Sequence, residues 1–271
     1  MRLVRLRGPR GVEHGTVEDG LVVTAAGTRV EPLDPATLEL PPPYALLLPV
    51  EPPEIWCAGV TYERSRDARV EESGSDVYAR VYDAERPELF LKDAGCRRTV
   101  GPGGAVGVRS DAAWSVPEPE IGLVLGDGGA IAGYTVGNDV SSRDIEGTNP
   151  LYLPQAKVYA GACALGPAVF VPAEPPAAFA IGLRIADAGG AVLFAGETST
   201  ARMRRGFEEL VGWLLRDNPV PAGSVLLTGT GLVPPDDFTL RPGMRVEVSV
   251  PEIGTLVSTV CPATELLERS R

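Results

Sequence analysis

A chain of 271 residues with 44% hydrophobic residues is long enough to form one or two globular domains with a packed core. Its net charge of −11 argues against a nucleic-acid partner, because proteins that bind nucleic acids usually present a basic surface. The sequence has no apolar run of the roughly 18–20 residues that cross a bilayer and no apolar leader after Met1, so we expect no membrane partner and a cytoplasmic protein.

Histidine, lysine and cysteine are informative because they are scarce. The only histidine, His14, is expected in a turn between short strands, which argues against a Ser-His-Asp or Cys-His catalytic unit and against a histidine metal site. Lys92 and Lys157 are the only lysines among 25 basic residues, and lysine differs from arginine in being a compact charge with a tunable pKa. The four cysteines form no CxxC pair, which favours buried free thiols.

Residues 1–48 are expected to form a small N-terminal β subdomain. Short strand-like runs such as residues 20–24 occur there between turn residues, and the segment ends near the stiff connector Pro41-Pro42-Pro43. Residues 49–271 would then form the main domain.

The main domain reads as many short strands with few helices. The apolar run 55–60 indicates a buried strand, and the polar segment 63–85 indicates two helical pieces broken at Gly74. Apolar spacing over residues 207–215 predicts an amphipathic helix, with cap residues at 198–200. Further strands are expected at 88–91, 120–125 paired with 130–136, 179–186 paired with 191–195, 225–228, 244–250 and 256–260. The fold class is therefore α+β and β-rich rather than doubly wound.

Three carboxylates are expected to meet on the first of these hairpins. Glu118 and Glu120 lie two residues apart, so their side chains point to the same face of a strand. If the turn centres on residues 127–128, position 120 lies opposite about 135–136, and Asp139 comes close to both glutamates. Crowded carboxylates require a cation or raised pKa values. Ligands that are all oxygen suit Mg²⁺ or Ca²⁺ better than zinc or iron.

The two lysines have different expected roles. Lys157 follows Asp139 by eighteen residues, after a dense polar loop, so we expect it to act at the same site. Lys92 follows the apolar pair Phe90-Leu91, where a structural salt bridge is the better expectation.

Several motifs of the chain resemble one known family. They are Glu118-x-Glu120, Gly133-Tyr134-Thr135, Asn138-Asp139-Val140-Ser141-Ser142-Arg143-Asp144, Lys157 with Gly166-Pro167, Thr228-Gly229-Thr230-Gly231, and Gly254-Thr255-Leu256. In these motifs the chain resembles the fumarylacetoacetate hydrolase family over most of residues 55–260. The resemblance implies that family's fold, a metal site of Glu118, Glu120 and Asp139 that holds Mg²⁺ (or Ca²⁺ or Mn²⁺), and a homodimer or homotetramer.

A second set of segments resembles the branch of that family that dehydrates 2-keto-3-deoxy-pentonates such as 2-keto-3-deoxy-D-arabinonate. They include Gly59-Val60-Thr61-Tyr62-Glu63, Arg86-Pro87-Glu88, Asn149-Pro150-Leu151-Tyr152-Leu153-Pro154-Gln155 and Arg216-Asp217-Asn218-Pro219. Many hydrolases of the family carry a water-activating histidine on a lid, where this chain has Ser65 and Arg66. The resemblance implies Glu71, Glu88 and Lys157 as catalytic residues. It places Ser65 and Arg66 at the substrate, on a lid formed by residues 63–86.

The expected function is a metal-dependent dehydratase of pentose catabolism that converts a 2-keto-3-deoxy-pentonate to 2,5-dioxopentanoate. We expect Arg143 and Thr230 to position substrate oxygens, with a structural role as the alternative for each. Other functions stay open: an acylpyruvate-type C–C hydrolase, a keto-acid decarboxylase, or a non-enzymatic module that binds structural Ca²⁺. A Schiff base on Lys157 is an alternative mechanism.

Overall fold

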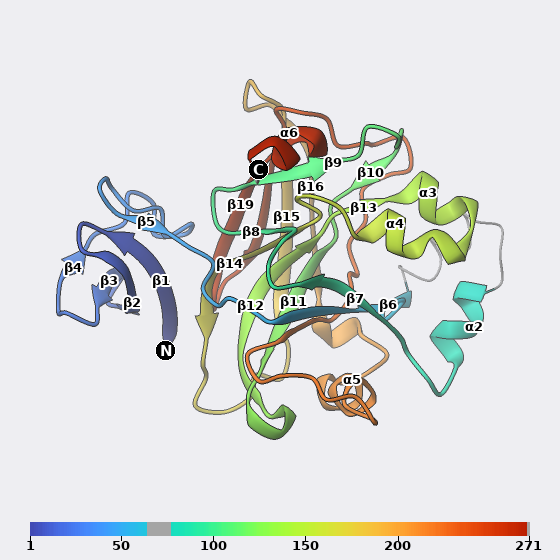
Figure 1. Ribbon diagram of the computed structural model, residues 1–271, viewed down its shortest axis with the longest axis horizontal. Coiled ribbons are helices and arrows are strands. Elements are labelled where there is room, and N and C mark those ends of the chain that lie inside the picture. Colours follow the sequence, from blue (N-terminus) through green and yellow to red (C-terminus); the bar gives the residue numbers. More distant parts are fainter. Residues whose placement is uncertain (64–76, 270–271) are drawn as a thin grey trace.

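The computed structural model describes residues 1–63 and 77–269, and Figure 1 shows a body of β-sheets with a few short helices at its margins. The α+β, β-rich class expected from the sequence is confirmed. Among the described residues, none of the helices combines the length and the apolar character needed to span a membrane.

The larger sheet has twelve strands and carries the site. In spatial order they are β4 (Arg29–Val30), β3 (Leu21–Thr24), β2 (Gly11–Glu18), β1 (Arg2–Gly8), β14 (Cys163–Phe170), β12 (Ile131–Asp139), β11 (Pro119–Leu125), β17 (Val225–Leu227), β6 (Glu54–Gly59) and β7 (Glu88–Ala94), with β5 (Ala45–Leu46) on β1 and β8 (Thr99–Val100) on β14.

A five-stranded sheet packs against the central strands of the larger one. Its order is β16 (Val192–Ser199), β15 (Ala180–Ala186), β18 (Arg245–Val250), β19 (Gly254–Pro262) and β9 (Ala105–Val108). Ile121 and Val136 of the first sheet share one fully buried core with Ile181, Val248 and Leu256 of the second. A separate pair, β10 (Ser115–Val116) and β13 (Ser141–Ser142), lies beside the ends of β11 and β12.

The described helices are short. They are α2 (Val77–Asp83), α3 (Arg143–Thr148), α4 (Leu153–Lys157), α5 (Phe207–Leu214) and α6 (Ala263–Arg269), with single 3-10 turns η1 (Asp127–Gly129), η2 (Pro150–Tyr152) and η3 (Thr200–Arg202). Helices α3 and α4 contact each other next to β13, at the end of the sheet where β11 begins and β12 finishes (Figure 1).

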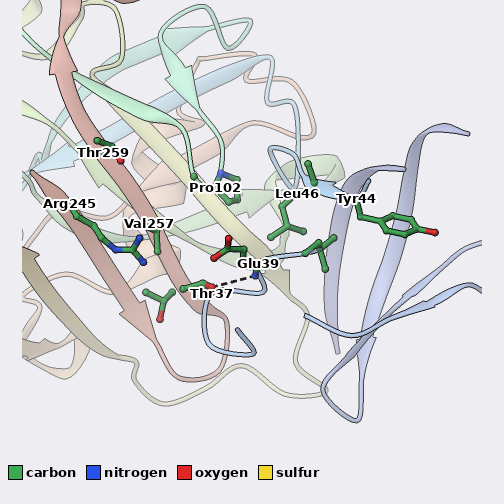
Figure 2. Close-up of a pocket in the computed structure, with 12 residues that line it drawn as sticks. Thr37, Glu39, Tyr44, Leu46, Pro102, Arg245, Val257 and Thr259 are labelled. Carbon is green, nitrogen blue, oxygen red and sulfur yellow. Dashed lines mark hydrogen bonds between the residues drawn. The ribbon is translucent and has the colours of Figure 1, made fainter. Parts of the chain in front are cut away.

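The N-terminal strands β1–β5 form a group of their own, drawn in blue in Figure 1. They are tied to the main body by β1, which pairs with β14 through Arg2 and Leu3. A pocket lies between this group and the second sheet, with Tyr44 and Leu46 on one side and Arg245 on the other (Figure 2). The boundary at residue 48 stays a prediction. His14 lies within β2 and not in a turn, so that expectation was wrong.

The predicted hairpins and helix are present, with two differences. Glu120 pairs with Gly137, one to two residues beyond the expected partner, because a β-bulge leaves Ala132 unpaired between Gly133 and Ile131. The helix α5 begins after Gly206, which makes no side-chain cap, whereas Ser199 caps the 3-10 turn η3. The second hairpin forms from β15 and β16 as expected.

Candidate active site

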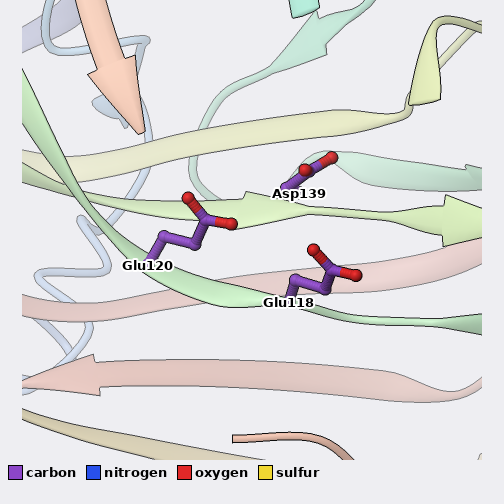
Figure 3. A group of neighbouring side chains, drawn as sticks. All are labelled: Glu118, Glu120 and Asp139. Carbon is purple, nitrogen blue, oxygen red and sulfur yellow. The ribbon is translucent and has the colours of Figure 1, made fainter. Parts of the chain in front are cut away.

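Three buried carboxylates meet where β11 and β12 begin and end. Glu118, Glu120 and Asp139 each offer an oxygen within 4.8 Å of the others, and their side chains converge in Figure 3. Each residue is at most 3% exposed. The backbone N–H of Asp139 donates to the carbonyl of Glu118 at 2.9 Å, which holds the two strands together at this point. We call these three residues the triad.

Two of the triad carboxylates are paired with buried cations. The Nζ of Lys157 lies 2.8 Å from Oε2 of Glu118 and 2.9 Å from Oδ2 of Asp139. Lys92 makes a close ion pair with Asp139, and Nη2 of Arg143 donates to Oε1 of Glu118 at 3.0 Å. The structural salt bridge expected of Lys92 is therefore present. An unpaired buried charge is costly, so these contacts are what allow the carboxylates to lie inside the protein.

Glu120 differs from the other two members of the triad. Its Oε2 accepts a hydrogen bond of 2.7 Å from the backbone N–H of Gly229, and it makes no ion pair with the described residues. Burial, followed by the charges of Asp139 and Glu118, raises the pKa of its carboxyl group well above the usual value. A divalent cation bound between the three carboxylates would offset this penalty, because its charge favours the ionised form.

The donor set of the triad fits Mg²⁺. All three groups are carboxylates, which are the ligands that hard cations prefer, and three protein oxygens leave positions for water or substrate. The single histidine lies on β2, in the N-terminal group, so the described residues supply no imidazole for a zinc or iron centre at this place.

A pocket opens over the triad. It is lined by the triad and Lys157, together with Glu88, Phe90, Glu146, Leu153, Gly229 and Thr230. It thus combines a cation site, an amine and two further carboxylates, which is a set of groups able to bind an anionic substrate and to move protons on it.

Glycines allow the backbone to approach this pocket closely. A Cβ atom on Gly59, at the end of β6, would lie 1.9 Å from Oε2 of Glu88, its partner on β7. Gly229 has φ +87°, and a Cβ there would lie 2.1 Å from Oγ1 of Thr61. The residue at 229 must therefore be glycine for its N–H to reach Glu120.

Two short helices supply the remaining polar wall. Arg143 and Glu146 lie three residues apart on α3, and both are buried, so they share the face that contacts the site. Leu153 and Lys157 lie four residues apart on α4 and both line the pocket. Lys157 is the last residue of α4, a position at which the helix dipole favours a positive charge.

The residues predicted from the sequence divide into three groups. Glu88, Lys157 and Thr230 line the pocket with the triad. Arg143 binds Glu118 and is not among the pocket-lining residues, and Oγ1 of Thr230 bonds with the backbone of Leu232. Ser65, Arg66 and Glu71, which were predicted to act at the site, and most of the lid expected at 63–86 lie outside the described residues. The catalytic and substrate-binding roles stay predictions.

Glu146 is a pocket residue that the sequence reasoning missed. It is 2% exposed and faces the same pocket as Glu88 and Lys157. The sequence feature that could have indicated it is its position three residues after Arg143, because two side chains with this spacing in a helical turn lie on the same face.

Comparisons with known proteins agree with this geometry. Residues 54–261 match the family described as fumarylacetoacetate (FAA) hydrolase C-terminal. A Haloferax volcanii protein described as a "probable 2-keto-3-deoxyxylonate dehydratase" is 52% identical over 216 residues, which cover 79% of this chain and 74% of that protein. The 2-dehydro-3-deoxy-D-arabinonate dehydratase of Saccharolobus solfataricus is 47% identical over 219 residues, covering 78% and 73%.

Solved structures are similar to nearly the whole chain. A structure of 2-keto-3-deoxy-D-arabinonate dehydratase complexed with magnesium and 2,5-dioxopentanoate matches with a TM-score of 0.85 at 37% identity, covering 97% of this chain and 99% of that chain. A 5-carboxymethyl-2-hydroxymuconate delta-isomerase from Mycobacterium smegmatis matches with a TM-score of 0.72 at 25% identity, covering 97% and 100%.

Proposed function

This chain belongs to the fumarylacetoacetate hydrolase family, and we propose that within it the protein is a magnesium-dependent dehydratase that converts a 2-keto-3-deoxy-pentonate to 2,5-dioxopentanoate. The observation that carries the proposal is the union of the triad with Lys157 and Glu88 in one pocket. The identity to dehydratases, at 52% and 47%, exceeds the identity to the isomerase and supports the same reaction.

The substrate is a single compound under two names. In a 2-keto-3-deoxy acid, C2 is a ketone and C3 is a methylene, so only C4 of the pentonate is a stereocentre. The acids derived from D-arabinonate and D-xylonate therefore have the same structure, and both dehydratase relatives are compatible with one substrate pocket.

The reaction starts at the end of the substrate that carries the keto acid. Bound by the triad, Mg²⁺ would polarise the C2 keto group as a Lewis acid and would compete with the Lys157 ammonium for the oxygens of Glu118 and Asp139. Lys157, relieved of part of that ion pairing, takes a proton from C3 as the neutral amine. Glu88 donates a proton to the departing C4 hydroxyl, a role for which Glu71 is the other candidate.

Four further residues are proposed to position the substrate. Arg143 acts through Glu118, whose carboxylate it holds, while Thr230 offers its backbone and hydroxyl at the pocket wall. Ser65 and Arg66 are proposed to contact the substrate directly. We also propose that the protein is cytoplasmic and forms a homodimer or homotetramer. Light scattering of the purified protein would test its oligomeric state.

A product assay tests the reaction. The purified protein is incubated with Mg²⁺ and a panel of 2-keto-3-deoxy-pentonates, acylpyruvates and oxaloacetate, and products are identified by mass. We expect loss of one water from a pentonate and none of the other reactions. Two acids formed from an acylpyruvate would indicate the hydrolase instead, and CO₂ release would indicate the decarboxylase. Ca²⁺ binding without any turnover would indicate a structural module.

A further inference from the structure

The proposed product requires the loss of a proton from C5, which the first transfers by Lys157 and Glu88 do not provide. The substrate has hydroxyl groups on C4 and C5, whereas 2,5-dioxopentanoate has a methylene at C4 and an aldehyde at C5. Loss of the C4 hydroxyl with a C3 proton gives 5-hydroxy-2-oxopent-3-enoate, which is still an alcohol at C5. This enone is an isomer of the product, and it becomes the aldehyde only if a hydrogen bound to C5 leaves as a proton.

The pocket contains a carboxylate with no part in the first two transfers. Glu146 is 2% exposed and lines the pocket together with Glu88 and Lys157. It lies on α3 on the same helical face as Arg143, whose Nη2 donates to Oε1 of Glu118 at 3.0 Å. Glu146 therefore faces the substrate space and not the solvent.

Glu88 and Glu146 reach the pocket from different elements. Glu88 comes from β7, where it lies against Gly59, and Glu146 comes from α3. Both carboxylates line the pocket that also holds the triad, so a substrate bound at the triad through its keto acid would lie in the same pocket as both of them. Once Glu88 has protonated the leaving hydroxyl, it faces the new water molecule, whereas Glu146 can act on C5 before that water leaves.

We propose that Glu146 is the base that removes the C5 proton, an inference that rests on the proposed function. The C5–H electron pair forms the C4=C5 bond, the C3=C4 pair moves to C2–C3, and the keto oxygen takes up the charge. The Lys157 ammonium then returns its proton to C3, which leaves an enol at C4–C5. Glu146 gives its proton to C4 as the C5 hydroxyl loses its own proton to Glu88. All three residues regain their starting states, and the net change is the loss of one water.

The test separates water loss from aldehyde formation. Full-length wild type, Glu146→Gln and Glu88→Gln are given Mg²⁺ and 2-keto-3-deoxy-D-arabinonate, and proton NMR follows the olefinic C3 and C4 signals of the enone and the aldehyde proton at C5. For Glu146→Gln we expect continued water loss, accumulation of the enone, and aldehyde formation slowed about 100-fold. For Glu88→Gln, water loss and aldehyde formation should slow together, and the enone should not accumulate. Glu197→Gln, an exposed change on β16, should match the wild type.

Other results would overturn the assignment. Aldehyde formation at the wild-type rate in Glu146→Gln would mean that another group takes the C5 proton. If Glu146→Gln slows water loss and aldehyde formation equally, and Mg²⁺ still stabilises the variant, Glu146 acts in the first elimination. If Glu146→Gln does not fold, Glu146→Asp keeps the carboxylate but withdraws it, and enone must still accumulate. A wild type that dehydrates no pentonate would instead refute the proposed function, which separates the two failures.

Discussion

Glu120 is the triad residue on which cation binding depends most. Its carboxylate is buried, pairs only with the N–H of Gly229 among the described residues, and has a raised pKa because of burial and the neighbouring charges. In the metal-free protein its charge is therefore a cost, whereas the charges of Glu118 and Asp139 are paired with Lys157, Lys92 and Arg143.

We predict that Glu120→Gln abolishes stabilisation by Mg²⁺ and leaves the fold intact. A ligand at 100 times its dissociation constant stabilises a protein by about 2.7 kcal/mol, which is measurable as a rise in Tm. The wild type should show this rise, and the variant should show none, with a metal-free Tm at least as high as that of the wild type. Glu197→Gln is the control. An unchanged Mg²⁺ response in Glu120→Gln would mean that the cation binds elsewhere.

Lys157 should act without forming a covalent bond to the substrate. Its ammonium donates to Glu118, Asp139 and the hydroxyl of Ser141, which puts it beside the carboxylates that would hold the cation, and that cation would bind the keto oxygen in place of the amine. Borohydride added during turnover should therefore leave the protein mass unchanged, while Lys157→Gln lowers kcat by about 10²–10⁴-fold. A reduced adduct on Lys157 would instead establish the Schiff-base mechanism.

At the scale of the elements, the glycine that ends β6 controls the position of Glu88. A Cβ at Gly59 would lie 1.9 Å from the Glu88 carboxylate, which is the movable end of a side chain, so we expect Gly59→Ala to shift that carboxylate without unfolding the protein. A misplacement of about 1 Å can cost about 100-fold in rate, and kcat should fall by that order.

The matched control is Gly212→Ala in α5, where nothing lies within 4 Å of the added methyl group. It should leave kcat unchanged and stabilise the fold by up to about 1 kcal/mol, because alanine is the better helix former. An unaltered kcat in Gly59→Ala would show that the reaction does not depend on where Glu88 lies.

The elements also show why part of the site was predictable. The i, i+2 spacing of Glu118 and Glu120 and the short turn were enough to bring Asp139 beside them, and an error of one or two residues in register did not change that outcome. The β-bulge at Ala132 leaves no clear sign in the sequence. Glu146 was missed because α3 is only six residues long, too short for a periodic pattern to identify its buried face.

At the scale of the whole molecule, the site is built without the N-terminal strands. Every residue that lines the pocket over the triad comes from position 58 or later, yet Leu6 and Leu38 are fully buried in the core shared with the two sheets. The sequence predicted this group but not its attachment, since the pairing of β1 with β14 joins residues far apart in the chain.

Removal of residues 1–48 tests the predicted boundary. We expect the shortened chain to keep its Mg²⁺ response and its kcat, and to melt at a lower temperature because buried apolar contacts are lost. Thermal melts and kinetics on the same preparation measure both quantities. Loss of Mg²⁺ binding in a folded, shortened protein would show that the N-terminal strands shape the triad after all.

The scarcity of lysine has a practical consequence. Lys92 and Lys157 are the only lysine side chains, and both are at most 2% exposed. Reagents that acylate amines, and proteases that cut only after lysine, therefore meet no accessible lysine in the folded protein. Modification of either side chain would therefore report that the structure around the triad has opened, either locally or by unfolding.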